Sequence, residues 1–303
     1  MAQQPPFSSG GQAVIEGVML RGRKFMAIAV RAPNGSIVLH AEPLPPRLYS
    51  GVVARTPFLR GVTLLWDTLG LGMKALMFSA DVALQADKED APKAEMPKAV
   101  AWTSVAFALV VGIGIFFVTP NLLAGLFEGW FGNPFLVNVA EGAVRLALLV
   151  GYVGLIGLFP DIRRVYRYHG AEHMTIHAFE RGDPLQPEAI AQHPPEHPRC
   201  GTAFLLIVII LSILVFSLFG WPDLWLRILS RIVLIPVIAG LAYEVLKLGA
   251  RHERNPLLRA LVVPGLLLQK LTTRQPTPDQ IEVAVAAFQE LRRVEREAEA
   301  AAA

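Results

Sequence analysis

Cysteine and charge are both scarce in this chain of 303 residues. The single cysteine can form no disulfide within the chain, which excludes a disulfide scaffold and is typical of a reducing compartment. Charged residues make up 17%, against about a quarter in soluble domains, while 53% are hydrophobic. The net charge of +3 is too small to indicate nucleic-acid binding. This composition excludes a disordered chain and indicates a membrane protein that has the lipid bilayer as its solvent.

Four segments are long and apolar enough to cross the hydrocarbon core, which needs about 20 apolar residues. They are residues 99–119, 142–159, 201–220 and 226–248. Glu141 and Arg145 stand one helical turn apart at the start of the second segment, so they can neutralise each other. Arg227 and Arg231 open the fourth segment, and we expect them to reach the interface by snorkelling.

Lys and Arg are distributed unevenly among the loops. Residues 1–98 contain eleven, 161–200 contain five and the tail from 249 contains eight, whereas 120–138 and 221–225 contain none. Because an excess of Lys and Arg marks the cytoplasmic side, both termini and the 161–200 loop are predicted to be cytoplasmic. The first ten residues lack the features of a signal peptide. The sequence therefore predicts a multi-pass protein of the cell membrane.

The segment 1–56 is predicted to be cytoplasmic and β-rich. Residues 13–20 and 25–31 have strand character, and the turn signal at 33–35 leads into a third strand at 36–40. The region 11–42 is thus expected to form a β-hairpin or meander.

The segment 57–98 is predicted to be a helix followed by a charged linker at 87–98. The only charges of 57–81 recur every seven residues, so they form a narrow stripe on a helix: Arg60, Asp67, Lys74 and Asp81. Such a helix is expected to lie in the membrane interface or to pack on the bundle. A fifth span is the alternative.

The four-span domain is assigned to 99–255, and 256–303 follows it. Residues 256–271 are apolar but interrupted by Arg259 and Pro264, which favours a re-entrant or surface helix. A capping box at 277–280 predicts the start of a soluble amphipathic helix. Its apolar face is expected to bind a protein partner and consists of Ile281, Val285, Phe288 and Leu291. The predicted fold is a mainly α, polytopic membrane helix bundle with these two soluble additions.

Histidines concentrate in the central loop, where five of the seven fall between 169 and 197. His169, His173 and His177 repeat every four residues and share one face of a helix. Adjacent members can hold one ion, whereas His169 and His177 are about 12 Å apart by helical rise. Glu172 completes the His-x-x-Glu-His spacing of inverted zinc proteases, whose glutamate is a general base. The pattern predicts a divalent metal, with zinc favoured, and Glu172 as the catalytic residue.

Further ligands are sought in His197, Cys200 and Glu244. Thiolate and imidazole suit zinc, and Glu244 stands at the predicted cytoplasmic end of the fourth span. Three alternatives stay open: solvated or structural histidines, Cys200 as a nucleophile paired with His197, and Glu244 paired with a nearby cation.

Several blocks carry a resemblance to a known family. Residues 10–22 read GGQAVIEGVMLRG, 168–173 read YHGAEH, 197–202 read HPRCGT, and 264–265 with 269–274 read PG and QKLTTR. In this order they resemble the YqhQ-like family of bacterial inner-membrane proteins, over about residues 10–290. The resemblance implies a polytopic membrane protein with a His/Glu metal site, described generically as a metal-dependent enzyme, and implies no substrate. Three alternatives stay open for Glu16 of the first block: it faces that site, pairs with an arginine, or is an exposed polar residue on a glycine-kinked hairpin.

Two function classes follow. The first is a metal-dependent hydrolase at the cytoplasmic membrane face, acting on a lipid, a lipid-linked molecule or a membrane-proximal peptide. The second is a non-enzymatic membrane protein, either a metal-ion carrier or an assembly or regulatory factor with a structural histidine site. A carrier needs ionisable residues near the bilayer midplane, and these spans contain few, which favours the hydrolase.

Overall fold

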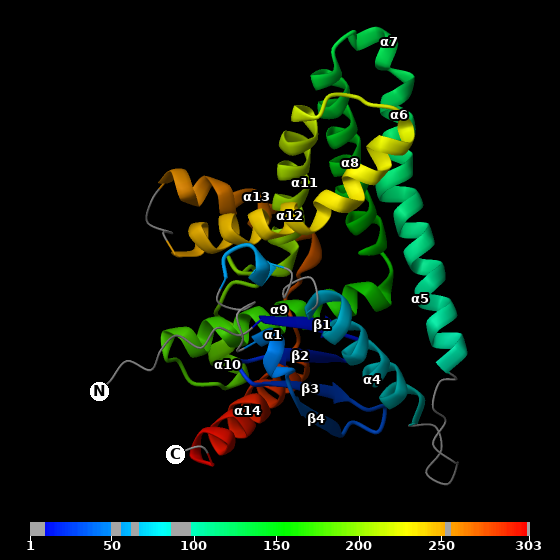
Figure 1. Cartoon of the computed structure of the whole chain (residues 1–303). Helices are drawn as coiled ribbons and strands as arrows, with labels where there is room; N and C mark the ends of the chain where they lie inside the picture. Colours follow the sequence, from blue (N-terminus) through cyan, green and yellow to red (C-terminus); the bar gives the residue numbers. More distant parts are fainter. Residues whose placement is uncertain (1–9, 50–55, 62–66, 86–97, 252–255, 302–303) are drawn as a thin grey trace.

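The computed structural model describes residues 10–49, 56–61, 67–85, 98–251 and 256–301. It has two parts: a bundle of long apolar helices, and an α/β domain built on a four-stranded sheet at one end of the bundle (Figure 1). The predicted fold class, a mainly α polytopic bundle with a small N-terminal β-structure, is confirmed.

The sheet is an antiparallel meander in the order β1-β2-β3-β4. Its strands are β1 (Gly10–Val14), β2 (Gly17–Arg21), β3 (Phe25–Arg31) and β4 (Ile37–Pro43). The single strand predicted over 13–20 was wrong, because the chain reverses at Ile15 and Glu16. Glu16 adopts φ 53°, and the Arg31 N–H donates to its carbonyl at 2.8 Å. A non-glycine residue makes this turn, so the usual turn signal is missing.

Side chains alternate between the two faces of the sheet, and both faces are buried. One face, with Val18 and Leu20, packs on α9 (Pro160–Arg181) and α14 (Pro278–Ala300). The other face, with Met19, packs on α4 (Gly72–Gln85). The domain therefore has three layers, and α9 also carries the histidine repeat.

The helix α4 follows a π-helical segment, η1 (Asp67–Leu71), and packs on the sheet through Ala75 and Val82, together with Leu71 of η1. The helix α4 therefore packs on the sheet rather than on the bundle, and its place in the membrane interface stays a prediction. Lys74 of the charged stripe pairs with Glu42 of β4 at 2.8 Å. Within the described residues α4 is not one of the candidate spans. The predicted linker lies outside the described residues apart from Lys98.

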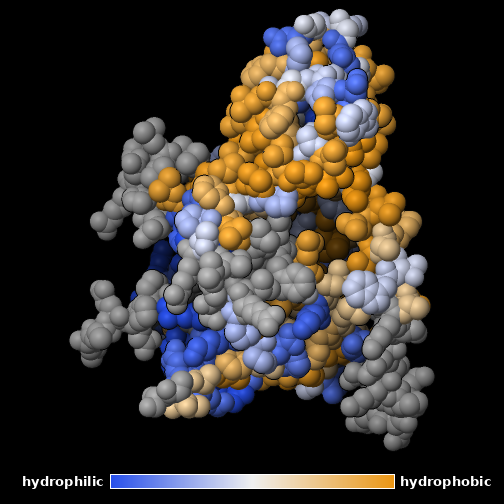
Figure 2. Space-filling view, viewed as in Figure 1, coloured by the Kyte–Doolittle hydropathy of each residue, from blue (hydrophilic) through white to orange (hydrophobic). Residues whose placement is uncertain are grey.

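Four helical stretches are long and apolar enough to cross a membrane: Trp102–Leu126, Pro134–Ile156, Gly201–Leu218 and Leu224–Gly249. The first comprises most of α5 (Lys98–Ile113) with η2 (Gly114–Val118) and α6 (Thr119–Leu126). The others are α8 (Pro134–Ile156), α11 (Gly201–Leu218) and most of α12 (Leu224–Arg251). Figure 2 shows a continuous hydrophobic surface on the bundle above the hydrophilic domain, as expected for a multi-pass membrane protein.

Charges are buried inside this bundle. Glu141 and Arg145 pair as predicted, with Arg145 Nη2 donating to Glu141 Oε1 at 2.6 Å. Arg231 also pairs with Glu141, and Arg227 and Arg231 are only 9% and 6% exposed. The predicted snorkelling was therefore wrong for Arg231, whereas Arg227 stacks on Trp221 in the loop before the span. A hydrogen-bonded carboxylate within the bundle holds Arg231 inside instead.

The remaining helices connect or close these parts. They are α1 (Pro46–Tyr49), α7 (Glu128–Phe131), α10 (Pro187–Ile190) and α13 (Pro256–Thr272). The helix α13 contains Pro264 and packs against α11 and α12, with Gly265 directly facing Ala203. The capping box of α14 is confirmed at Thr277 and Gln280. The apolar face of α14 is buried on the sheet and α9, so a protein partner for this helix stays a prediction.

Candidate metal centre

The helix α9 presents its histidine repeat to the loop that runs back towards the membrane. It begins with Pro160 in its first turn and ends at Gly182, which adopts φ 77°. Residues 170–176 within it are all buried. A Cβ built at Gly170 would clash with the Arg274 carbonyl oxygen, so the chain after α13 lies directly against the middle of α9.

The structure brings three of the predicted ligands together. One side-chain atom from each of His169, His173 and Cys200 lies within 4.8 Å of the other two. His169 Nε2 is 3.2 Å from Cys200 Sγ, and the ring centroids of His169 and His173 are 4.4 Å apart. Cys200 is the N-cap residue of α11, and the Thr202 N–H donates to its sulfur at 3.4 Å. The group thus lies where α11 leaves the α/β domain.

Backbone carbonyls orient both imidazoles. His169 Nδ1 is 2.9 Å from the Thr272 oxygen, and His173 Nδ1 is 2.7 Å from the Pro195 oxygen. A carbonyl only accepts, so each Nδ1 carries the proton that is donated. The Nε2 atoms are therefore the nitrogens available to a ligand. Metal-binding histidines are held in this way.

Burial and mutual attraction set the protonation of this group. Burial opposes a charged His169, but attraction to the Cys200 thiolate outweighs it and raises the His169 pKa to about 9. Burial likewise opposes the Cys200 thiolate, but His169 and His173 outweigh it and hold the Cys200 pKa well below its usual range. Burial lowers the pKa of His173. The thiolate and the neutral His173 are the forms that bind a cation, which would displace the His169 proton.

Glu172 lies beside this group and is only 3% exposed. Its Oε2 has no hydrogen-bond partner within the described part of the chain. Burial raises the pKa of Glu172 to about 8, and the attraction of His169 opposes this shift only in part. A Cβ built at Gly11 of β1 would clash with Glu172 Oε1, so only glycine leaves room for the carboxyl group there.

A second group consists of His177, Glu180 and His197. The rings of His177 and His197 are 4.6 Å apart, and His197 Nε2 is 3.6 Å from Glu180 Oε2. Burial lowers the pKa of His177 to about 4. Glu180 also pairs with Arg199, which competes with any cation for the carboxylate. The structure therefore separates His177 and His197 from the three ligands of the first group.

Other candidates have different partners. Glu244 accepts from Arg60 Nε at 2.6 Å and joins neither group of potential ligands. Glu16 accepts from Arg164 Nη2 at 2.6 Å, which confirms the predicted pairing with an arginine. Cys200 contacts His169, whereas His197 Nε2 faces Glu180, so the proposed pairing of Cys200 with His197 was wrong.

Sequence reasoning missed the groups that hold the site in place. Gln269 is fully buried; its Oε1 accepts from the His197 N–H at 2.8 Å, and its Nε2 donates to the His197 carbonyl at 3.0 Å. The carbonyls of Thr272 and Pro195 have no sequence signature, because every residue has one. The block 269–274 pointed to this region only through the family resemblance.

Comparisons with known proteins give a family but no activity. The family described as "Protein of unknown function (DUF1385)" matches residues 56–294. The uncharacterized protein YqhQ of Bacillus subtilis (strain 168) is 35% identical over 298 residues, which cover 96% of this chain and 94% of that protein. No solved structure matches.

Proposed function

The chain belongs to the DUF1385 family, and we propose that it is a membrane-bound, metal-dependent hydrolase whose ion is held by His169, His173 and Cys200. One observation carries this proposal. The half-buried His169 and the buried His173 are anchored through Nδ1 on carbonyls, and both rings lie close to the buried Cys200 sulfur. A cation satisfies all three groups at once, whereas a structural role alone leaves this orientation without a reason.

The three ligands fit zinc. Bond lengths of about 2.0 Å to nitrogen and 2.3 Å to sulfur place tetrahedral ligands about 3.5 Å apart, close to the 3.2 Å between His169 and Cys200. Three protein ligands with one open position are the pattern of catalytic rather than structural zinc sites. When bound, the ion supplies Lewis acidity to a carbonyl or phosphoryl oxygen.

Glu172 is the proposed general base. It precedes His173 on α9, is buried, and keeps one carboxyl oxygen without a partner among the described side chains and backbone. A cation held beside Glu172 would lower the raised pKa of its carboxyl group, and the ionised group could then accept a proton from water and pass it to the leaving group. The backbone of β1 at Gly11 lies directly against the Glu172 carboxyl group and restricts its position.

The proposed site faces the cytoplasm. The sheet, α9 and α14 share one core, so the described N-terminal and C-terminal parts lie at the same end of the bundle (Figure 1). That end carries the loops rich in Lys and Arg, and 120–138 and 221–225 carry none. Cys200 caps a candidate span, which favours a lipid-linked or membrane-proximal substrate.

Cysteine labelling tests this orientation in intact cells. Gly129→Cys lies in α7 and should react with an impermeant maleimide from outside, whereas Arg181→Cys in the soluble domain should not. The unaltered protein, whose single cysteine is Cys200, measures the background labelling. External labelling of Arg181→Cys would contradict the orientation.

Metal analysis of the purified full chain tests the site itself. We expect about one zinc per chain, and loss of it in His169→Ala and His173→Ala. His40→Ala is the matched control, because His40 lies in β4 and its side chain is 44% exposed. Full occupancy in the His169→Ala/His173→Ala double variant would refute the proposal.

The variant Glu172→Gln distinguishes a general base from a metal ligand. This variant keeps the shape of the side chain but cannot accept a proton, so metal content should stay within about threefold while hydrolysis stops. Loss of metal in Glu172→Gln would make Glu172 a ligand rather than a base.

A second candidate is a cysteine nucleophile, favoured by the 3.2 Å contact between His169 Nε2 and Cys200 Sγ. Iodoacetamide distinguishes the two. A thiolate bound to zinc is protected until a chelator is added, whereas a free thiolate of low pKa is alkylated at once. A non-enzymatic cation carrier fits less well, since guanidinium groups dominate the buried charges of the bundle and repel cations.

A further inference from the structure

A second polar site lies inside the bundle, away from the metal centre. Its centre is Glu141 of α8, which pairs with Arg145 one turn later and with Arg231 of α12. Arg227 lies one turn before Arg231 and stacks on the Trp221 ring at 3.8 Å. All four charged side chains belong to residues no more than 9% exposed. Ionisable groups at this depth in a candidate span are expensive to bury and indicate function.

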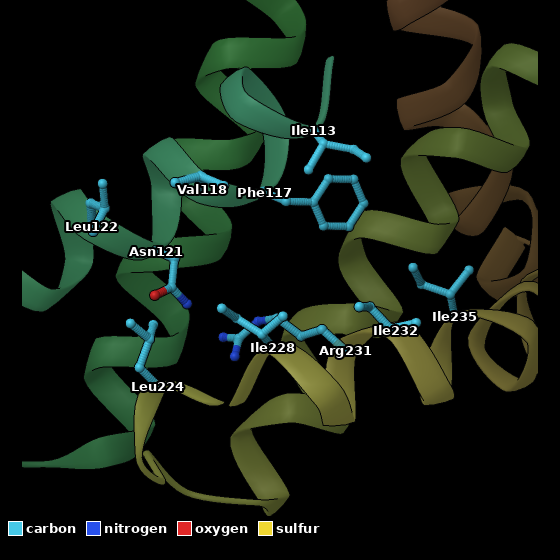
Figure 3. Close-up of a pocket in the computed structure, with 10 residues that line it drawn as sticks. All are labelled: Ile113, Phe117, Val118, Asn121, Leu122, Leu224, Ile228, Arg231, Ile232 and Ile235. Carbon is cyan, nitrogen blue, oxygen red and sulfur yellow. The ribbon is translucent and has the colours of Figure 1, made fainter. Parts of the chain in front are cut away.

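An apolar groove of about 270 Å³ adjoins this network, between α12 and the stretch formed by α5, η2 and α6 (Figure 3). Its walls are branched aliphatic side chains and one phenylalanine, with only Asn121 and Arg231 polar. The lining residues are Ile113, Phe117, Val118, Asn121, Leu122, Leu224, Ile228, Arg231, Ile232 and Ile235. Ile228 and Ile232 are 47% and 61% exposed on the outer surface of a candidate span, so the groove opens towards lipid.

Two polar side chains that line the groove have buried atoms without a hydrogen-bond partner among the described residues. Asn121 is 6% exposed, and neither its amide nitrogen nor its amide oxygen has a hydrogen bond within the described residues. Arg231 Nε is likewise without a partner in that part of the chain. Figure 3 shows the two side chains reaching into the groove from opposite helices. Burying an amide without hydrogen bonds destabilises the fold by about 1–3 kcal/mol, and a ligand that forms these hydrogen bonds would remove this penalty.

The charge of the network is positive. Arg145, Arg227 and Arg231 face one buried carboxylate, Glu141, among the described residues. Glu128 and Asp223 lie nearby, but both are exposed. The Arg145 guanidinium lies 5.5 Å from the centre of the Phe117 ring, and Phe117 lines the groove. The charge of Arg145 is therefore separated from the groove by this ring. The groove thus offers buried positive charge at one point and apolar walls elsewhere.

We propose that this groove binds an anionic phospholipid of the surrounding bilayer. The phosphate accepts hydrogen bonds from Arg231 Nε and the Asn121 amide, and one acyl chain lies along Ile228, Ile232 and Ile235. The volume is near the lower limit of about 300 Å³ for ligand pockets, which suits part of one chain rather than a whole lipid. Charge complementarity excludes a neutral lipid as the preferred ligand, and the apolar walls exclude a free anion.

The test measures lipid binding to the delipidated full chain in neutral detergent, by titration with native mass spectrometry. The probes are dioleoylphosphatidylglycerol and dioleoylphosphatidylcholine. Phosphatidylglycerol should bind at least tenfold more tightly, because the two lipids offer the same phosphate oxygens but the choline ammonium of phosphatidylcholine would meet the positive charge of the buried arginines. Glycerol phosphate, the headgroup without chains, should not displace it.

Two variants test the geometry. Ile232→Trp fills the groove and should weaken phosphatidylglycerol binding at least tenfold, while Val233→Trp, equally exposed at 62% but outside the groove, should leave it unchanged. Asn121→Leu should weaken binding about tenfold and raise the Tm of the lipid-free protein, because it removes an unpaired amide. This second readout shows that the variant is folded.

Three results would overturn the proposal. Equal binding of the two lipids removes the role of charge, and undiminished binding in Ile232→Trp removes the groove. Displacement by glycerol phosphate alone would make the site one for soluble anions rather than for lipid.

Discussion

The two buried polar clusters of this protein are built in opposite ways. In the α/β domain, imidazoles and a thiol are oriented by backbone carbonyls, and their charges depend on bound protons. In the bundle, three guanidinium groups keep fixed charges; Arg145 and Arg231 pair with the Glu141 carboxylate, and Arg227 stacks on Trp221. A cluster whose protons can leave adapts to a cation, whereas a cluster of fixed positive charge can only be matched by an anion.

The difference has an energetic consequence. Removing a ligand from the histidine cluster leaves groups that can change protonation state, so the fold should survive. Removing the carboxylate from the arginine cluster leaves buried charges that cannot be neutralised. Stability should therefore depend most on the bundle network, and ion binding on the other cluster.

The largest effect is expected for Glu141→Leu. It leaves Arg145 and Arg231 buried without their counter-charge and should lower the free energy of unfolding by about 3–5 kcal/mol. Thermal unfolding in detergent measures this loss. Glu128→Leu is the control, since Glu128 is exposed. Adding Arg231→Leu to Glu141→Leu should restore part of the stability; an unchanged Tm in Glu141→Leu would show that the network does not stabilise the bundle.

Next in size is Cys200→Ala, which removes one of three proposed ligands. Metal affinity should fall more than 100-fold, because even groups that only orient ligands contribute about 10–100-fold. Competition with a chelating dye measures it. His193→Ala should change the affinity little, since His193 pairs with Asp183 at 3.1 Å and belongs to neither ligand group. Equal losses in both variants would point to a general collapse of the loop.

Structural features that depend on residues close together in the sequence could be predicted. Span length, the capping box of α14 and the histidine repeat follow from local hydrophobicity, hydrogen bonding and helical period. The pairing of Glu141 with Arg145 is local too and was predicted correctly. The β1–β2 turn was missed because Glu16, not glycine or asparagine, adopts the positive φ.

Contacts between distant segments could not be predicted in this way. Arg231 looked like an interfacial residue until α12 brought it to Glu141, 90 residues earlier. Of three candidates for a third predicted ligand, the loop after α9 brings Cys200, rather than His197 or Glu244, next to His169 and His173. The apolar face of α14 indicated a partner but covers the sheet of its own chain. Periodicity shows that a face is buried, not what buries it.

A smaller effect is expected for Gly11→Ala at the edge of the metal centre. The added methyl group clashes with Glu172 Oε1, so it should destabilise the fold by about 1–3 kcal/mol and displace the carboxyl group. Chemical denaturation measures the loss. Gly10→Ala is the matched control in the same strand, because its Cβ meets only the flexible Arg21 guanidinium at 3.6 Å. Similar losses in both variants would indicate that any side chain at this end of β1 disturbs the strand, rather than a specific clash with Glu172.

The smallest effect is expected for Glu244→Gln, which tests whether the metal centre takes a ligand from the bundle. Position alone made Glu244 a candidate ligand, yet its carboxylate accepts from Arg60, and the two side chains are 25% and 21% exposed. Solvent screens such a pair, so the variant should lose no more than about 1 kcal/mol of stability. Metal content should stay equal to that of the unaltered protein, measured beside Cys200→Ala in one preparation. A fall in metal content would show that Glu244 leaves Arg60 when the ion binds. The metal centre would then extend into the bundle and take a ligand from a candidate span.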